Sequence, residues 1–127
     1  MCQSAKDYRK KWSVSPHGRA NKLIHNAKRR CVKSGGKVTV TQEWIENRLN
    51  LGVCELTNLL FDLQPSKSDH SNAYAPSLDR IDSKNPNYSP DNTRVVLVAV
   101  NRALNEHGDK YLLPILKAMI AGIEKHG

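Results

Sequence analysis

The chain has 127 residues, of which 39% are hydrophobic and 25% are charged, and its formal net charge is +8 at pH 7. This length allows one domain with a single core. The sequence holds no run of about eighteen apolar residues, and its charged start lacks the apolar stretch of a secretory signal. These features exclude the membrane-spanning class, and we expect a soluble, cytoplasmic protein without a membrane partner.

The positive charge is concentrated in the N-terminal part of the chain. Residues 1–37 hold eleven lysines and arginines against one acidic residue, whereas the other 90 residues hold nine against eleven. Such segregation is typical of proteins that bind a polyanion, because neutralised phosphates release condensed counterions. A merely solvated basic face is the alternative. Tyr8 and Trp12 lie among the charges and favour nucleic acid, since aromatic rings stack on bases. The residues that we expect to contact duplex DNA are Arg9, Lys10, Lys11, Lys22, Lys28, Arg29, Arg30 and Lys33.

A basic amphipathic helix is predicted to follow from residue 18. Ala20, Ala27 and Cys31 recur on one face at helical spacing, and Gly35 and Gly36 stop the helix. We therefore interpret residues 1–37 as a basic N-terminal helical segment and place the rest of the fold in residues 38–127.

Three short elements come next. Residues 37–41 alternate as a short strand, and Thr41 can cap a helix that ends near Gly52. Residues 53–63 predict a hairpin, with Asn58 available for a left-handed turn position. The residues of the capped helix that we expect to face inward are Trp44, Ile45 and Leu49.

The second half of the chain is predicted as strand, loop, strand and helix. Residues 76–82 and 93–98 have the composition of strands, 83–92 form a long turn, and a short helix ends at Gly108. A last helix, from residue 109, carries an apolar stripe that we interpret as core packing or as a homodimer face. The stripe consists of Leu112, Leu113, Leu116, Met119, Ile120 and Ile123.

Within this half, the block LDRID…NYSPDNTRVVLVAVN resembles the HNH nucleases of the ββα-metal (His-Me finger) superfamily. It is most similar to the small HNH-like proteins of phages, and the run EWIENRLNLGVCELTNLLFDL fits the upstream half of the same pattern. The resemblance covers about residues 41–104. It implies an α+β fold, with a ββα-metal (HNH-like) core and flanking helices in one compact domain.

The resemblance assigns roles to four residues. The first strand of HNH proteins ends in an Asp that binds a divalent metal ion and a His that activates water, and this chain has Asp79 and Arg80 there. Asn92 matches the middle Asn, which braces the loop and orients the base, and Asn101 matches the metal ligand that opens the helix. The implied catalytic residues are Asp79, Arg80 and Asn92. The implied cofactor is one Mg or Mn ion on Asp79 and Asn101, because these ions prefer oxygen ligands.

Three interpretations of Arg80 remain open, because a guanidinium stays protonated and cannot act as a general base. Arg80 grips the scissile phosphate while another residue or a metal-activated water acts as the base. Alternatively, it marks a lineage that binds DNA without cutting it, or it pairs with Asp82. We favour the first interpretation, under which His70 and Tyr74 in the upstream loop are candidate bases.

A second departure from the family concerns zinc. Many HNH proteins carry zinc-binding cysteines before the final His, but the matching positions in this chain are Leu97 and Val100. Cys2, Cys31 and Cys54 lie far apart and lack Cys-x-x-Cys spacing. We therefore expect reduced thiols and no structural zinc.

These features together predict a metal-dependent endonuclease that hydrolyses DNA phosphodiester bonds, of phage or mobile-element origin and located in the host cytoplasm if phage-encoded. The alternative is a catalytically inactive HNH-like module that binds DNA or a protein partner, for example a phage inhibitor of a host defence factor. A small RNA-binding protein would share the charge but would not explain the spacing of Asp79, Asn92 and Asn101.

Overall fold

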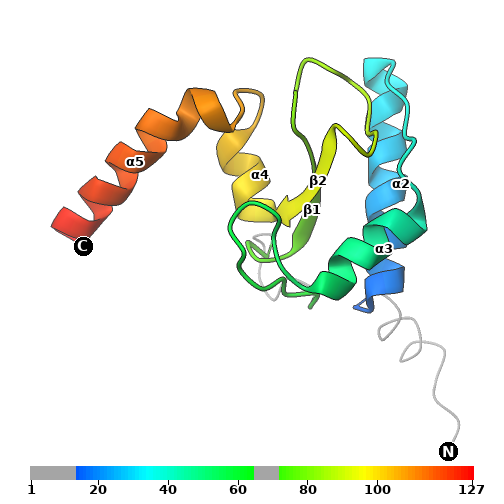
Figure 1. Cartoon of the computed structure of the whole chain (residues 1–127), viewed down its shortest axis with the longest axis horizontal. Helices are drawn as coiled ribbons and strands as arrows, with labels where there is room; N and C mark the ends of the chain where they lie inside the picture. The colour runs from blue at the N-terminus through cyan, green and yellow to red at the C-terminus, as the bar shows by residue number, and fades with distance from the viewer. Residues whose placement is uncertain (1–13, 65–71) are drawn as a thin grey trace, which may run out of the picture.

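The computed structural model describes residues 14–64 and 72–127. In chain order its elements are α2 (Pro16–Ser34), α3 (Gln42–Leu51), β1 (Pro76–Arg80), β2 (Thr93–Leu97), α4 (Val98–Leu104) and α5 (Asp109–His126). Helices and one small antiparallel sheet make up this part of the chain, which confirms the α+β class (Figure 1). None of the helices in the two described stretches is long and apolar enough to cross a bilayer.

The helix α2 begins and ends where the sequence supplies caps. Ser15 Oγ accepts a hydrogen bond from the Gly18 amide at 3.0 Å, and Pro16 occupies the first turn, where its missing N–H is not needed. Gly35 has a φ of 76° and ends the helix in the left-handed conformation, as predicted. The buried face is the predicted one and contains Gly18, Ala20, Ala27 and Cys31.

The helix α3 packs against α2 and closes the main core. Thr41 Oγ1 accepts a hydrogen bond from the Trp44 amide at 3.0 Å, which confirms the predicted cap, and Gly52 ends the helix with a φ of 81°. Both helices cover the same side of the sheet (Figure 1). The most buried members of this core are Ala20, Ala27, Ile45 and Val95.

The two strands pair directly, and they are the only strands within the described residues. In this pairing Leu78 lies opposite Val95, and Asp79 lies opposite Arg94. The next residues of β2, Val96 and Leu97, form a second small cluster with Cys54. The sheet therefore has apolar contacts on both faces, and the charged pair between Asp79 and Arg94 lies close to its loop end.

Of the two shorter β elements predicted upstream, one is confirmed and one is not. The hairpin forms through a bridge between Val53 and Leu60, and Asn58 has the expected positive φ of 62°. The strand predicted over residues 37–41 is wrong. Val38 forms an isolated bridge with Tyr88, because this segment runs beside the loop that precedes β2 and not beside a strand.

The last two helices differ from the prediction in length and in burial. The helix α4 ends at Leu104, because Asn105 adopts a φ of 45°, so it stops before Gly108. No residue of α5 is buried, and Figure 1 shows this helix extending away from the sheet and from α2 and α3. The interpretation of α5 as core packing is therefore wrong.

Candidate functional site

A polar hollow lies between α2, the loop end of the sheet and α4. We call it the polar pocket; its volume is about 380 Å³. The residues that line it are Arg30, Leu78, Asp79, Arg80, Ser83, Tyr88, Asn101, Asn105 and Glu106. Four residues singled out from the sequence, namely Arg30, Asp79, Arg80 and Asn101, therefore meet at one place.

The carboxylate of Asp79 is buried and is held by an arginine from the neighbouring strand. Arg94 Nε donates a hydrogen bond to Asp79 Oδ2 at 2.7 Å, and Arg94 Nη1 donates one to Asp109 Oδ2 at 3.2 Å. Burial raises the pKa of Asp79, and the hydrogen bond and charge of Arg94 act in the opposite direction. Arg94 lowers the pKa of Asp109, which lies at the start of α5. One guanidinium thus connects the wall of the pocket to the last helix.

The side chain of Asn101 is oriented by its amide group. Its Nδ2 donates hydrogen bonds to Ser77 Oγ at 2.7 Å and to the Leu78 carbonyl oxygen at 3.1 Å. A carbonyl oxygen only accepts, so the NH₂ group must be the one that faces β1. Among the described residues, no donor is bonded to Asn101 Oδ1 or to Asp79 Oδ1. Each residue therefore has one side-chain oxygen without a donor among the described residues, and both residues line the polar pocket.

Two arginines from different elements meet around the ring of Tyr88. Arg30 Nη1 donates a hydrogen bond to the Tyr88 hydroxyl at 3.2 Å, and the guanidinium carbon of Arg80 lies 5.6 Å from the centre of the ring. Arg80 Nη1 also donates a hydrogen bond to the Asn85 carbonyl at 3.4 Å. The ring of Tyr88, which is 4% exposed, therefore positions two positive groups in the wall of one pocket.

One of the three interpretations drawn from the sequence was that Arg80 pairs with Asp82. The described residues form no ion pair between these two side chains. Asp82 Oδ1 instead accepts a hydrogen bond from the Lys84 amide at 3.0 Å and stabilises the turn after β1. The interpretations of Arg80 as a phosphate ligand and as the mark of a binding module remain.

The loop between the strands is braced by Asn92, which is 6% exposed. Its Oδ1 accepts a hydrogen bond from the Asp82 amide at 2.9 Å, and its Nδ2 donates one to the Asn87 carbonyl at 3.0 Å. Two longer bonds of 3.4 Å join the same amide to the carbonyls of Asp82 and Asn85. Asn92 therefore holds the loop that carries Ser83 and Tyr88, and it does not line the pocket itself.

A divalent ion of the magnesium type fits the residues of the polar pocket. Such an ion prefers hard oxygen ligands and retains several waters, and Asp79 Oδ1 and Asn101 Oδ1 are oxygens of that kind. The described part of the chain contains no group of three or more His, Cys, Asp or Glu side chains that could hold a metal ion. Two protein oxygens with a phosphate and water would complete the coordination, so the donor set suits an ion that binds together with its substrate.

Other expected site residues lie elsewhere. Tyr74 lines an apolar groove on the other side of α4 and not the polar pocket, so the structure does not bring this candidate base to Asp79. The residues that fall outside the described part of the chain are Arg9, Lys10, Lys11 and His70.

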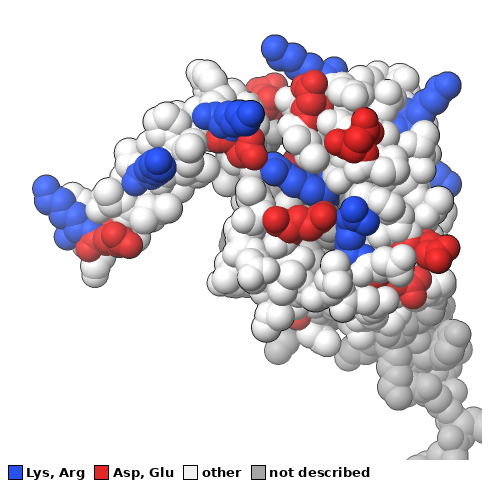
Figure 2. Space-filling view, in the orientation of Figure 1, with Lys and Arg blue, Asp and Glu red and all other residues white. Residues whose placement is uncertain are grey.

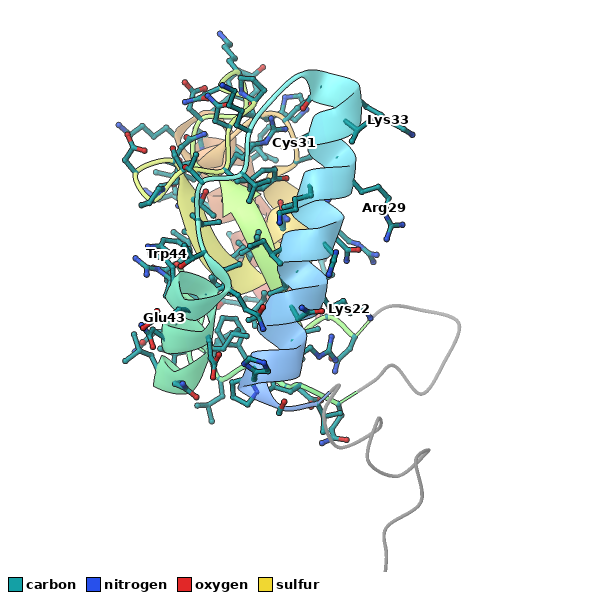
Figure 3. The ribbon with its side chains drawn as sticks, turned by 90° about the vertical axis from the view of Figure 1, so that its right-hand side faces the viewer. Lys22, Arg29, Cys31, Lys33, Glu43 and Trp44 are labelled. Carbon is teal, nitrogen blue, oxygen red and sulfur yellow. The ribbon has the colours of Figure 1, made fainter. Side chains whose placement is uncertain are left out.

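The basic residues of α2 point in three directions. Lys22, Arg29 and Lys33 lie on the face opposite the core, and Figure 3 shows Arg29 and Lys33 directed away from the sheet. Arg30 turns into the polar pocket, and Lys28 lies on the other flank, beside Lys37. On the face in Figure 2, Lys and Arg alternate with Asp and Glu, so the basic residues form no continuous patch on that face.

The positions that match the zinc-binding cysteines of HNH proteins are apolar in the structure. Leu97 is 3% exposed and forms a cluster with Cys54 and Val96, against which Val100 and Phe61 pack. Apolar contacts thus occupy the place of the metal ligands, and the absence of zinc stays a prediction.

Two residues that shape the pocket, Arg94 and Tyr88, have no functional role predicted from the sequence. The sequence predicts Arg94 only as part of a strand, because its pairing with Asp79 depends on the register of β1 and β2. Tyr88 was included in the family motif without a role. A buried tyrosine in a polar loop is a detectable signal, since its ring needs packing and its hydroxyl needs a partner.

Comparison with models of known protein families, with curated proteins and with solved structures finds no match for this chain. The polar pocket therefore has to be interpreted from its own chemistry.

Proposed function

We propose that this protein is a metal-dependent endonuclease of the HNH type that hydrolyses phosphodiester bonds in DNA, with a ββα-metal core formed by β1, β2 and α4. One observation carries the proposal. Asp79 from β1 and Asn101 from α4 line the same pocket as Arg80 and Arg30. Oxygen ligands for a cation and guanidinium groups for an anion are the two requirements of a site that holds a metal ion and a phosphate together.

Each side chain has a definite task in this proposal. Asp79 and Asn101 would hold a magnesium or manganese ion through their available oxygens. When bound, such an ion supplies positive charge for the phosphoryl oxygens and the leaving oxygen. Arg80 and Arg30 would donate hydrogen bonds to the non-bridging oxygens of the same phosphate, where guanidinium groups bind in a planar, two-pronged manner.

Several residues act by positioning the others. Arg94 holds the buried Asp79 carboxylate, Tyr88 orients the two arginines, and Asn92 braces the loop that carries Tyr88. The outer face of α2, with Lys22, Arg29 and Lys33, would contact backbone phosphates beside the pocket, because Arg30 on the same helix already enters it.

A second candidate function, a DNA-binding module that does not cut, is favoured by a different observation. Arg80 cannot accept a proton from water, and no histidine of the described chain lines the polar pocket. The same two arginines would then bind a phosphate without cleaving its ester. Both candidate functions predict that the protein binds duplex DNA, but only the first predicts that it cleaves the DNA.

Incubation of purified protein with supercoiled plasmid in magnesium, manganese or EDTA tests the proposal. We expect nicked or linear product with either ion and none in EDTA. Asp79→Asn keeps the shape and an acceptor for Arg94 but removes the charge, and it should lower the cleavage rate by at least about 100-fold. Asp91→Asn is the matched control, because Asp91 is exposed and bonds only to Ser89 among the described residues.

Duplex binding, measured by fluorescence anisotropy in the same buffers, separates the two candidates. Binding without cleavage in any divalent ion would establish the non-cutting module. Cleavage that survives both EDTA and Asp79→Asn would contradict the metal-dependent mechanism.

A further inference from the structure

The side of α4 that faces away from the polar pocket borders an apolar groove. Its volume is about 380 Å³. We call it the apolar groove, and it is lined by Leu56, Thr57, Leu59, Ala73, Tyr74, Leu97, Ala99, Val100, Ala103, Leu104 and Leu116. Leu116 belongs to α5, so the groove runs along the start of that helix.

The same chain also presents an apolar helix face that none of the described residues covers. Met119, Ile120 and Ile123 lie on the stripe of α5 that begins at Leu112, and they are 51%, 55% and 63% exposed. Figure 1 shows the last turns of α5 projecting beyond the rest of the fold. Within residues 14–64 and 72–127, each chain therefore has an open apolar groove and an apolar helix with no buried residue.

We propose that a second copy of this chain covers both surfaces, in a two-fold dimer in which α5 of each copy occupies the apolar groove of the other. A two-fold dimer requires a surface that is complementary to itself. The concave groove and the convex stripe fulfil this requirement, because both lie on one chain and both are apolar. Since Leu116 forms one wall of the groove, a helix placed there also lies against the first α5.

The area of the two surfaces agrees with that of a stable dimer. A helix of 18 residues is about 27 Å long and about 10 Å wide, so half of its surface amounts to roughly 400 Å². In the proposed arrangement each copy contributes one helix face and the surface on which the partner's helix lies, and two surfaces in contact lose about equal areas, so each copy buries roughly 800 Å². Stable interfaces bury about 800 Å² on each partner.

The shape of the groove favours a helix over a lipid surface. A bilayer could cover the exposed stripe of α5, but a bilayer is flat on this scale and would not fill the groove that α4, α5 and the hairpin border. A helix can fill it. The dimer would also leave the polar pocket open, since Asn101 and Asn105 lie on the opposite side of α4.

Sedimentation velocity on the full chain tests the dimer. The wild-type chain of 14.3 kDa should sediment as a dimer at 50 μM. Ile123→Glu on the stripe and Leu59→Glu in the groove should each weaken association at least tenfold, and both positions are half exposed or more, so the monomer fold tolerates the change. Lys125→Glu is the control and should leave the dimer intact, because Lys125 lies nine residues after Leu116 and therefore on the opposite side of α5. A monomeric wild type, or a dimer that resists both substitutions, would overturn the proposal.

Disulfide cross-linking tests whether α5 of one copy lies in the apolar groove of the other. Two variants are made in a Cys2→Ser background, one with Leu59→Cys and the other with Ile120→Cys. The remaining natural cysteines, Cys31 and Cys54, are buried and should not react. Mixing the two chains under mild oxidation should yield a disulfide between them in high proportion. Cross-links only between two Ile120→Cys chains would contradict the exchange of α5 into the groove. Association only with vesicles, without dimer in buffer, would show that a lipid surface covers the helix.

Discussion

The two sides of α4 serve different chemistry. Asn101 and Asn105, four residues apart, line the polar pocket, whereas Ala99 and Ala103, also four residues apart, line the apolar groove. Because successive residues of a helix are about 100° apart, two such pairs project from different sides. One helix of seven residues thus separates a surface suited to a phosphate from a surface suited to another protein chain. Substitutions on one side should leave the other side unaffected.

The same comparison applies to the two long helices. Both α2 and α5 are amphipathic, and they have 19 and 18 residues. Four residues of α2 are buried against α3 and the sheet, but none of α5 is buried. An apolar stripe therefore indicates that one face of a helix will be buried, but it does not indicate which surface will bury that face.

The largest expected effect concerns Arg80. Under the proposed function, Arg80→Ala should lower the rate of plasmid cleavage by about 100-fold to 1,000-fold. The change removes the guanidinium whose positive charge stabilises the phosphoryl oxygens in the transition state. Arg80→His should lower it as well, although it restores the residue usual in the resembling family. Neither change should alter the sedimentation of the protein, since Arg80 lies on the polar side of α4.

Cleavage assays on these two variants check this prediction, with Lys125→Ala as the control, because Lys125 is an exposed cation in the last turn of α5 and lies outside the polar pocket. An inactive wild type combined with a gain of cutting in Arg80→His would show that the chain had lost catalysis at this one position. It would then be the binding module.

A smaller effect is expected on stability. Arg94→Ala leaves the buried Asp79 carboxylate without its partner, and loss of one member of a buried pair costs about 3 kcal/mol. The double change of Arg94→Ala with Asp79→Asn should recover part of this loss, because no buried charge remains. Urea denaturation of the wild type, the single variant and the double variant measures both changes in stability. Equal stability of the single and double variants would contradict a role for Arg94 in stabilising the Asp79 charge.

The smallest effect separates two neighbouring arginines of α2. Arg30→Gln should weaken duplex binding about tenfold, since Arg30 faces the polar pocket, and Arg29→Gln should weaken it less. Each lost phosphate contact should reduce the slope of log affinity against log salt by about 0.9. Anisotropy titrations at several salt concentrations provide both quantities. Identical losses for the two variants would mean that the pocket contributes nothing specific to binding.

Much of the local structure was predictable. The caps at Thr41, Gly35 and Gly52, and the left-handed turn at Asn58, all depend on residues within a few positions of one another. The strands β1 and β2 and the bracing role of Asn92 were also expected, the latter through the resemblance to HNH proteins. The meeting of Asp79 with Asn101 followed from the same motif, and the structure places both in one pocket.

What the sequence by itself determined was where helices and strands begin and which face of each is apolar, because caps and periodicity act over one or two turns. Only the tertiary structure decided the partners. The register that sets Arg94 against Asp79 depends on the whole loop between the strands, and the entry of Arg30 into the pocket depends on how α2 crosses the sheet. The exposure of α5 depends on α4, which ends at Leu104, after which the chain directs the last helix away from the core. These are contacts between distant segments, and local patterns do not specify which segments meet.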